Sequence, residues 1–345
     1  MSSKLKVIIL EEDEPRRRKL QRFLAEQPPV EVIGVISLGE KLLKAAIRDV
    51  PDVVIISTYT GDGEGLTAVR QLMANFPKPI LIAGSRSGLG ASEALAALRC
   101  GAIDIVPHPA DIDLEERDRI GTLFQEKVAL AARIKVIRHL IPVAIPLREK
   151  RPRRRLNGIT DKRVVAVGAS TGGPILLQNL FQSLPGDTPV AFLVVQHILK
   201  HFTAELANSL AALSRLTVKE AEMNETIRPG CVYISPGNRH MTVGSGNRIQ
   251  LADGPEVSGH RPSVDVLMES VAQKYGERAV GILLTGMGRD GVEGMRCIKE
   301  RGGVTIAQDE ATSVVFGMPG AAIAAGVVDY VLAAEDLPVK ILGLV

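Results

Sequence analysis

The sequence predicts an α/β fold with two doubly wound parallel-sheet domains and a β-ribbon insertion in the second. Three observations lead to this prediction. At 345 residues, the chain is long enough for two domains that each bury a core. Short β-rich runs alternate with helical segments in both halves, which is typical of parallel sheets covered by helices. A stretch punctuated by prolines, residues 141–160, separates the halves and indicates a linker.

The first half contains five β-rich runs with amphipathic segments between them. Within residues 4–109 these runs are LKVIIL, VEVIGVI, DVVIIS, KPILIAG and AIDIVPHP. A long helical pattern at residues 113–141 follows and should close the first domain. We therefore expect a first domain at residues 1–125, a helical and basic linker at 126–160, and a second domain at 161–345.

The second half repeats the alternation with different contents. Its strand candidates are RVVAVG, PVAFLVVQ, AVGILLT, GGVTIAQ and VVDYVL. The less regular section at residues 216–252 has short β-rich pieces separated by turn residues, such as GCVYISPGNRHMTVGSGNRIQL. We expect this section to form the hairpins of the β-ribbon.

Composition excludes several classes of protein. Hydrophobic residues make up 46% and charged residues 23% of the chain, a normal globular balance. The longest apolar runs fall far short of the roughly 18 residues of a membrane-spanning helix, and the start turns acidic too early for a signal peptide. Cys100, Cys231 and Cys297 lack metal-type spacing, so we expect reduced thiols in a cytoplasmic protein that has no metal site and no membrane insertion.

The net charge of +3 comes from one basic run, REKRPRRR at residues 148–155. This run holds six Lys/Arg and one Glu, which leaves 36 basic and 38 acidic residues in the remainder. Aromatic residues, which stack on nucleic-acid bases, make up only 3% of the chain and are absent from the run. We interpret the run as a solvated tether between the domains and expect no nucleic-acid partner.

The segment GASTGGP, residues 168–174, follows a β-rich run and precedes a helical one. Its first five residues fit the G-x-S-x-G turn that exposes a nucleophilic serine, here Ser170. A phosphate-binding loop would end in G-K-[ST], whereas Gly173 is followed by Pro174. On its own, this segment does not distinguish a nucleophile from a plain glycine-rich turn.

A nucleophilic serine needs a base, and the base needs an orienting carboxylate. Of the six histidines, His197 alone ends a buried-type run; the others are His108, His139, His201, His240 and His260. Asp290 follows another such run, AVGILLT, and its competitors are Asp253, Asp265 and Asp309, with Asp265 expected in the first turn of a helix. Because the carboxyl ends of parallel strands meet at one edge, Ser170, His197 and Asp290 are expected to face one crevice. Their order in the chain differs from that of α/β-hydrolases.

The segments GASTGGP, QH, GHRPSVDVL, LLTGMGRDG and IAQDEATSVVFGMP, together with the first domain, resemble chemotaxis response regulator protein-glutamate methylesterases. This resemblance covers nearly the whole chain. It implies a flavodoxin-like receiver fold followed by an α/β/α hydrolase domain, and a triad of Ser170, His197 and Asp290. It further implies an oxyanion and substrate region formed by four other residues: Thr171, Met287 through its backbone N–H, His260 and Arg261.

The implied reaction is hydrolysis of glutamate 5-methyl esters on the cytoplasmic helices of chemoreceptors, and deamidation of receptor glutamines, without any cofactor. Arg289 stands where the family commonly has a small polar residue, and we expect it to face solvent. Two alternatives stay open. One is a serine hydrolase or amidase that acts on a different methylated or amidated protein. The other is a non-catalytic adaptor that binds receptors.

The first domain departs from the receiver pattern. Glu11 and Glu12 supply the acid pair, but Ser57 stands at the phospho-acceptor position, Gly84 replaces the Thr/Ser after the fourth strand, and His108 replaces the lysine. Asp62 is out of register with the acid pair. Because an acyl phosphate needs a carboxylate, we predict a pseudo-receiver that is not phosphorylated and that serves as a docking module for a chemotaxis kinase or another regulator.

Overall fold

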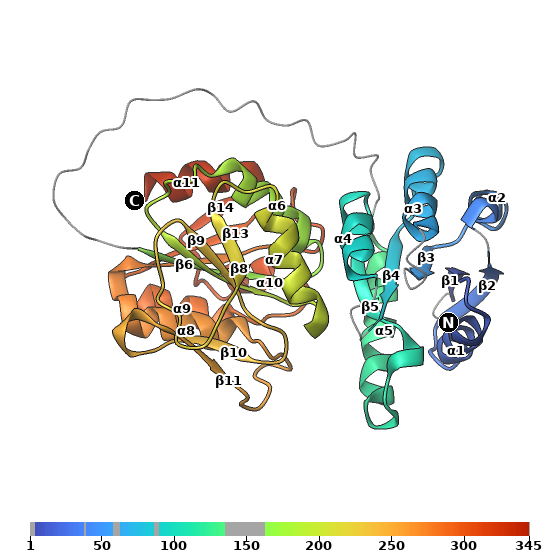
Figure 1. Ribbon diagram of the computed structural model, residues 1–345, viewed down its shortest axis with the longest axis horizontal. Coiled ribbons are helices and arrows are strands. Elements are labelled where there is room, and N and C mark those ends of the chain that lie inside the picture. The colour runs from blue at the N-terminus through green and yellow to red at the C-terminus, as the bar shows by residue number, and fades with distance from the viewer. Residues whose placement is uncertain (1–3, 38, 58–62, 86–89, 135–162, 345) are drawn as a thin grey trace. The chain divides into compact units, whose positions relative to one another are not determined.

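The computed structural model describes residues 4–37, 39–57, 63–85, 90–134 and 163–344 (Figure 1). The chain divides into two compact units, Met1–Ile141 and Pro142–Val345. The basic run at 148–155, His139 and Asp62 lie outside the described residues. No helix in the described part of the chain is long and apolar enough to cross a membrane.

The first unit is a five-stranded, all-parallel sheet with the strand order β2-β1-β3-β4-β5. This order is the flavodoxin-like one that the resemblance implied. Its strands are β1 (Leu5–Leu10), β2 (Val30–Ile36), β3 (Val53–Ser57), β4 (Ile80–Gly84) and β5 (Asp104–Pro107). Its helices are α1 (Glu14–Ala25), α2 (Gly39–Asp49), α3 (Glu64–Asn75), α4 (Ala91–Arg99) and α5 (Arg117–Ala131).

Helix α5 corrects the boundary that we placed at residue 125. Its residues Phe124, Val128 and Ala131 are buried in the core of the first unit, together with the apolar residues of α1 and β1. Phe124 also meets Phe23 of α1 edge to face, with ring centroids 5.3 Å apart. A boundary at 125 would cut through the apolar face of this helix, so α5 belongs wholly to the first unit.

The second unit is a seven-stranded, all-parallel sheet with the order β14-β13-β12-β6-β7-β9-β8. Its strands are β6 (Val164–Ala169), β7 (Ala191–Gln196), β8 (Thr217–Glu220), β9 (Cys231–Ile234), β12 (Ala279–Leu283), β13 (Val304–Gln308) and β14 (Tyr330–Leu332). Its helices are α6 (Gly173–Ser183), α7 (Thr203–Ala211), α8 (Val264–Tyr275), α9 (Val292–Glu300), α10 (Met318–Ala324) and α11 (Leu337–Gly343).

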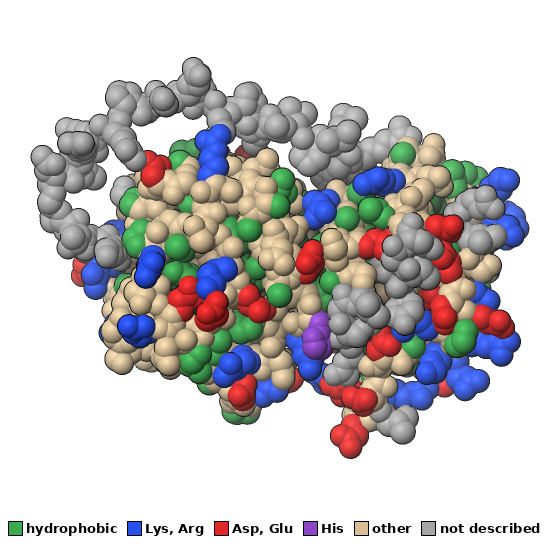
Figure 2. Space-filling view, viewed as in Figure 1, with side chains coloured by type: hydrophobic (Ala, Val, Ile, Leu, Met, Phe, Trp, Pro, Cys, Tyr) green, Lys and Arg blue, Asp and Glu red, His purple; other side chains and the backbone are tan. Residues whose placement is uncertain are grey.

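Helices cover both faces of this sheet (Figure 1). One face packs against α8, α9 and α10 and shares its core with the hairpin of β10 (His240–Val243) and β11 (Ile249–Ala252). The other face is covered by α6, α7 and α11. On the side of the second unit seen in Figure 2, described side chains of both charges are interspersed and neither sign forms a continuous field.

The predicted β-ribbon is smaller than we expected. Only β10 and β11 form an antiparallel hairpin among the described residues of this section, whereas β8 and β9 join the edge of the main sheet in parallel. In β9 the three consecutive residues Val232, Tyr233 and Ile234 are all buried, as in a strand covered on both faces. The ribbon prediction was therefore wrong for residues 217–234.

Candidate active site

Ser170 directly follows the wholly buried strand β6 and is itself 5% exposed. The turn after it is tight, because Gly172 has a left-handed φ of 80° and α6 begins at Gly173. A Cβ on Gly173 would lie 2.1 Å from Gln196 Oε1, so no larger residue fits between the turn and β7. A strand, a sharp turn and a helix thus place the serine at the carboxyl edge of the sheet.

His197 occupies the matching position on the neighbouring strand. Strands β6 and β7 are in register up to the pair Ala169 and Gln196, so Ser170 and His197 come next at the same edge. The His197 N–H donates to Ala169 O at 2.9 Å, and the Gln196 side-chain amide donates to Ser170 O at 2.8 Å and to His197 O at 3.0 Å. Gln196 therefore ties the two strand ends together.

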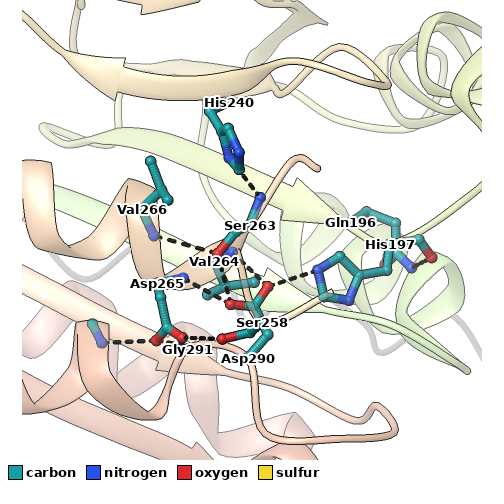
Figure 3. Close-up of polar contacts among 11 residues, drawn as sticks. Gln196, His197, His240, Ser258, Ser263, Val264, Asp265, Val266, Asp290 and Gly291 are labelled. Atoms are coloured by element: carbon teal, nitrogen blue, oxygen red, sulfur yellow. Dashed lines mark hydrogen bonds and ion pairs between the residues drawn. The ribbon is translucent and has the colours of Figure 1, made fainter. Parts of the chain in front are cut away.

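Asp290 lies in the loop between β12 and α9 and is almost completely buried. Its Oδ2 lies 2.9 Å from His197 Nε2 (Figure 3). The same carboxylate accepts hydrogen bonds from Ser263 Oγ (2.8 Å) and from the backbone N–H groups of Val264 (2.8 Å) and Asp265 (3.0 Å). These groups form the start of α8, whose positive end of the helix dipole favours an anion.

These contacts keep Asp290 ionised. Burial acts to raise its pKa, but the hydrogen bond and charge of His197 and the two backbone N–H groups lower it to about 2. Asp290 is therefore a permanent anion at neutral pH. It orients the imidazole and can stabilise a positive charge on it.

Asp265 sits in the first turn of α8, as its position in the sequence suggested, but its carboxylate serves a different helix. Its Oδ1 accepts hydrogen bonds from the N–H groups of Gly291 (2.9 Å) and Gly294 (2.8 Å) at the start of α9 (Figure 3). Burial and the neighbouring charge of Asp290 raise its pKa to about 6. Asp290, which precedes α9, thus binds the amino end of α8, and Asp265 of α8 binds the amino end of α9. These hydrogen bonds hold α8 and α9 together beside the site.

His240 is a structural histidine. Its Nε2–H donates to Pro255 O at 2.8 Å, and its Nδ1 accepts from the Ser263 N–H at 3.3 Å. Both ring nitrogens are used, so this buried ring has no capacity left for proton transfer. It holds Ser263 in place for the hydrogen bond to Asp290.

His260 and Arg261 lie in the loop before α8. The His260 ring stacks on the His197 ring, with centroids 3.8 Å apart and an angle of 8° between the planes. The Arg261 guanidinium donates to Asn238 Oδ1 at 2.8 Å and to Gly254 O at 2.6 Å. His260 therefore buttresses the face of the His197 ring, while Arg261 braces the loop that carries it.

His197 has one unused basic nitrogen. Because Asp290 accepts the Nε2–H, the neutral ring carries its lone pair on Nδ1. This Nδ1 is buried and has no hydrogen-bond partner among the described residues. The structure thus joins His197 to Asp290 and places Ser170 at the adjacent strand end, without a hydrogen bond from Ser170 to His197. Such bonds are often long before substrate binds.

The turn that contains Met287 lies against the serine. The Ser170 N–H donates to Thr285 O at 3.0 Å, and a Cβ on Gly286 would lie 2.7 Å from Ser170 Cβ. The N–H groups of Gly317 and Met318 both bind Gly286 O, at 3.0 and 2.9 Å, and fix the turn. Met287 itself is half-buried at this position. Thr171 O accepts from Thr285 Oγ1 at 3.0 Å, so Thr171 is held by the same turn.

Comparisons with known proteins agree with this arrangement. The CheB methylesterase family matches residues 165–341. Protein-glutamate methylesterase/protein-glutamine glutaminase 2 of Anaeromyxobacter dehalogenans (strain 2CP-C) is 42% identical over 335 residues, 97% of this chain and 95% of that protein. The chain belongs to the CheB methylesterase family. A family member from Pyrococcus horikoshii, named protein-glutamate methylesterase/protein-glutamine glutaminase, is 36% identical over 98% of this chain and 93% of its own length.

The second unit of this CheB-family chain also resembles a solved structure. The crystal structure of the Thermotoga maritima CheB methylesterase catalytic domain matches with a TM-score of 0.53 and 41% identity. The match covers 53% of this chain and 99% of that structure. The α/β/α architecture of the second unit is therefore that of CheB catalytic domains.

The first unit of this CheB-family chain has a closed polar cluster at the carboxyl edge of its sheet. His108 is fully buried, and its Nε2 lies 3.2 Å from Glu11 Oε2. The Arg16 guanidinium forms two hydrogen bonds with Asp111, of 2.9 and 3.1 Å. Ser57 ends β3 as predicted and is 9% exposed. The cluster therefore lies at the carboxyl edge of the sheet, with Glu11 beside Ser57.

Electrostatics inside this cluster favour the uncharged histidine and the ionised acid. Burial lowers the pKa of His108. Burial acts to raise the pKa of Glu11, but the adjacent His108 and Ser57 side chains lower it on balance. Glu12, the second acid, is half-buried, and its carbonyl accepts from Arg17 Nη1 at 3.1 Å.

The residue after the fourth strand of the first unit is not Gly84, as we expected, but Ser85. Gly84 is the last residue of β4, and Ser85 is buried directly behind it. A hydroxyl group therefore does follow the fourth strand, one position beyond the predicted one. Burial acts to raise the pKa of Asp111, but Arg16 and the Ser85 hydroxyl lower it, so Ser85 is part of the cluster.

Sequence reasoning missed several residues that position the site: Gln196, Ser263, Thr285 and Gln308. A serine directly before an apolar-periodic run is an N-cap signal, and this signal could have identified Ser263. Gln196 is the polar last residue of β7, and Thr285 lies two residues beyond β12, where its N–H donates to Gln308 Oε1 at 2.7 Å. Only the folded chain shows which backbone groups they hold.

Proposed function

We propose that this chain is a serine-type protein-glutamate methylesterase and protein-glutamine glutaminase, with a triad of Ser170, His197 and Asp290. The observation that carries the proposal is the 2.9 Å contact between His197 Nε2 and Asp290 Oδ2. It leaves a buried Nδ1, unpartnered among the described residues, on the strand end next to Ser170. The names of its family relatives support the same activity.

In the first half of the reaction, Ser170 Oγ attacks the carbonyl carbon of a glutamate methyl ester while His197 Nδ1 takes the Oγ proton. The carbonyl electron pair moves to oxygen and forms a tetrahedral oxyanion. When the intermediate collapses, the bond to the methoxy oxygen breaks, and His197 returns the proton so that methanol leaves. With a glutamine substrate, ammonia leaves instead. The product of this half is an acyl-enzyme on Ser170.

In the second half, His197 Nδ1 takes a proton from water, and the hydroxide attacks the acyl carbon. The bond to Ser170 Oγ then breaks, Oγ recovers the proton from His197, and the glutamate carboxylic acid leaves and loses its own proton to solvent. Asp290 stays ionised throughout because its pKa lies near 2, and it stabilises the imidazolium in both halves. No step requires a metal or an organic cofactor.

Backbone N–H groups of the turn beside Ser170 stabilise the oxyanion. The Ser170 N–H is engaged with Thr285 O and so is not available as a donor. The Met287 N–H, on a turn held by Gly317 and Met318, is the donor that we propose, with Thr171 beside the nucleophile. Rigid donors of this kind contribute more than donors that must reorganise during the reaction.

The substrates that we propose are the methylated cytoplasmic helices of chemoreceptors, which places the enzyme in the cytoplasm and in chemotaxis-type adaptation. The pseudo-receiver provides a regulatory surface for a kinase or another regulator. Ser57 offers no carboxylate for an acyl phosphate, and the buried cluster of Glu11, His108 and Arg16 occupies the surrounding space.

The deciding experiment is methanol release from methylated receptor fragments by the full chain, by Ser170→Ala and by the matched control Ser183→Ala. We expect release by the full chain and by the control but not by Ser170→Ala. A serine-reactive organophosphonate provides a second readout, since it should label Ser170. Labelling without methanol release would indicate an enzyme that acts on a different ester or amide. The absence of both labelling and methanol release would indicate a non-catalytic adaptor.

A further inference from the structure

A cavity of about 290 Å³ lies at the edge of the second unit opposite to Ser170. Val164 and Ala191, the first residues of β6 and β7, form part of its lining, and Lys274 and Tyr275 line it from the carboxyl end of α8. Strand β6 has six residues at roughly 3.3 Å each, so about 20 Å separate this cavity from the serine. The cavity is therefore distinct from the proposed active site.

Three cationic residues from separate segments converge on the cavity: Arg163, Lys274 and Arg278. None of the described residues that line it is an aspartate or glutamate. Glu277, which is next to Arg278 in the sequence, places its side chain against Gly302, where an added Cβ would lie 3.0 Å from Glu277 Cγ. Its carbonyl oxygen accepts from Arg163 Nη1 at 3.1 Å. A concave surface lined by one sign of charge concentrates counter-ions.

The floor of the cavity is apolar. Val164 and Ile227 are buried in the hydrophobic core of the second unit, and Pro229 lines the cavity beside them. Tyr275 is only 8% exposed, and its hydroxyl hydrogen-bonds to Asn247 Oδ1. The Asn247 side-chain amide in turn donates to Ile227 O at 2.9 Å, so this wall is fixed.

The side of the cavity that Tyr275 forms is also uncharged. Burial raises the pKa of Tyr275 to about 12, so its hydroxyl keeps its proton at physiological pH. A ligand in the cavity would meet aromatic and aliphatic side chains together with the cationic side chains of Arg163, Lys274 and Arg278. Guanidinium and ammonium groups bind carboxylate and phosphate oxygens through charge-assisted hydrogen bonds.

We propose that this cavity binds a small organic anion, a carboxylate or phosphate carried on a flat apolar body. The rim cations hold the anionic group, and the floor beside Tyr275 covers the apolar body. A volume of about 290 Å³ matches a ligand the size of one substituted ring. The anionic group decides recognition, so a neutral ligand of the same shape binds weakly.

The test is a titration of the full chain with phenyl phosphate, benzoate, inorganic phosphate and the neutral benzamide. Calorimetry measures affinity, and backbone amide NMR locates the site. We expect saturable binding of phenyl phosphate or benzoate, with shifts centred on Asn247, Lys274 and Tyr275, and at least ten-fold weaker binding of benzamide and inorganic phosphate. The tighter of the two aryl anions identifies the anionic group.

Substitutions at the rim show whether its cations hold the anion. Lys274→Gln combined with Arg163→Gln should weaken binding at least ten-fold, because each removes one charge-assisted contact. The matched control Arg215→Gln, a cation elsewhere on the unit, should leave affinity unchanged. Ser170→Ala should also bind normally, so the result does not depend on the proposed esterase.

Three outcomes would overturn the proposal. The first is no saturable binding of either aryl anion at millimolar concentration. The second is equal affinity for benzamide or inorganic phosphate and the aryl anions. The third is binding that the Lys274 and Arg163 substitutions do not weaken.

Discussion

Asp290→Asn tests the proposed mechanism most directly, because it keeps the shape of the side chain and removes its charge. In the native site Asp290 only accepts hydrogen bonds, from His197, Ser263 and two backbone N–H groups. An asparagine that turns its NH₂ group toward His197 would donate to Nε2. The imidazole proton would then sit on Nδ1, and the lone pair that should receive the Ser170 proton would be lost.

The size of the effect follows from the geometry. Treated as a full ion pair with a separation of 2.9 Å, imidazolium and carboxylate interact by about 6 kcal/mol at an effective dielectric constant of about 20. This interaction exists in the transition state and not with the neutral ring, so its loss lowers kcat by about 10⁴-fold. The same substitution in a serine protease triad, where it imposes the wrong tautomer, has a similar effect.

Methanol release from a methylated receptor fragment, measured at saturating substrate, gives kcat for Asp290→Asn. The matched control is Asp253→Asn, which changes an exposed aspartate paired with Arg239. Nitrogen NMR of His197 reports the tautomer independently. A kcat within ten-fold of the native value, or an unchanged tautomer in the variant, would refute the reasoning.

Three further predictions follow from the same structure. Ser170→Ala and His197→Ala should each lower esterase turnover by several orders of magnitude, leaving roughly the 10³-fold catalysis that binding and an oxyanion hole supply; near-full activity in Ser170→Ala, measured by methanol release, would exclude this residue as nucleophile. Acetyl phosphate with Mg²⁺ should leave activity unchanged because Ser57 cannot form an acyl phosphate; several-fold activation, with label in the first unit, would contradict this. Asp265→Asn should increase the free energy of unfolding at pH 8 by about 3 kcal/mol and leave it unchanged at pH 3, as measured in urea, since the carboxyl of Asp265 prefers its protonated form in the folded state; equal effects at both pH values would show that its charge is not the cause.

The sign of the last effect depends on the direction of each pKa. The pKa of Asp265 is raised from 3.8 to about 6, so its contribution to stability is complete below pH 4 and is lost as pH rises through 6. The pKa of Asp290 is lowered from 3.8 to about 2, so its contribution is present above pH 4 and is lost as pH falls through 2. The two carboxyls therefore act on stability in opposite directions, and an asparagine at 265 removes only the unfavourable one.

The sequence was most informative where local pattern and topology coincide. The proximity of Ser170 and His197 could be predicted from the buried-type runs that precede them, because a parallel sheet brings the carboxyl ends of neighbouring strands together. The register of β6 and β7, which makes these two residues immediate neighbours, requires the folded sheet. The hydrogen-bond partners of Asp290 could not be predicted from the sequence, because they lie at the start of α8, more than twenty residues away in the chain.

The two errors in the fold also have physical causes. β8 is a short edge strand, and three of its four residues, Thr217, Lys219 and Glu220, are polar, so its pattern resembles a hairpin arm more than a buried strand. The boundary at residue 125 ignored the apolar period of α5, in which Phe124, Val128 and Ala131 face the core. In both places the deciding contacts are with elements distant in the sequence.

The two units contain the same pair of residue types and use it differently. In each, a histidine at the carboxyl edge of a parallel sheet lies beside a buried carboxylate, with Nε2 to carboxylate distances of 3.2 Å for His108 and Glu11 and 2.9 Å for His197 and Asp290. The difference lies in the second ring nitrogen. His108 Nδ1 accepts the Ala110 N–H at 3.0 Å, so no basic nitrogen is left to act on the nearby serine.

His197 Nδ1, in contrast, has no partner among the described residues and lies beside the strand end that carries Ser170. His108 is also fully buried, whereas the His197 side chain is 9% exposed at the carboxyl edge of its sheet. A serine, a histidine and an acid in proximity are thus not sufficient for hydrolysis. The nitrogen that the acid does not bind must also lack a hydrogen-bond partner, and of these two pairs only His197 and Asp290 meet that condition among the described residues.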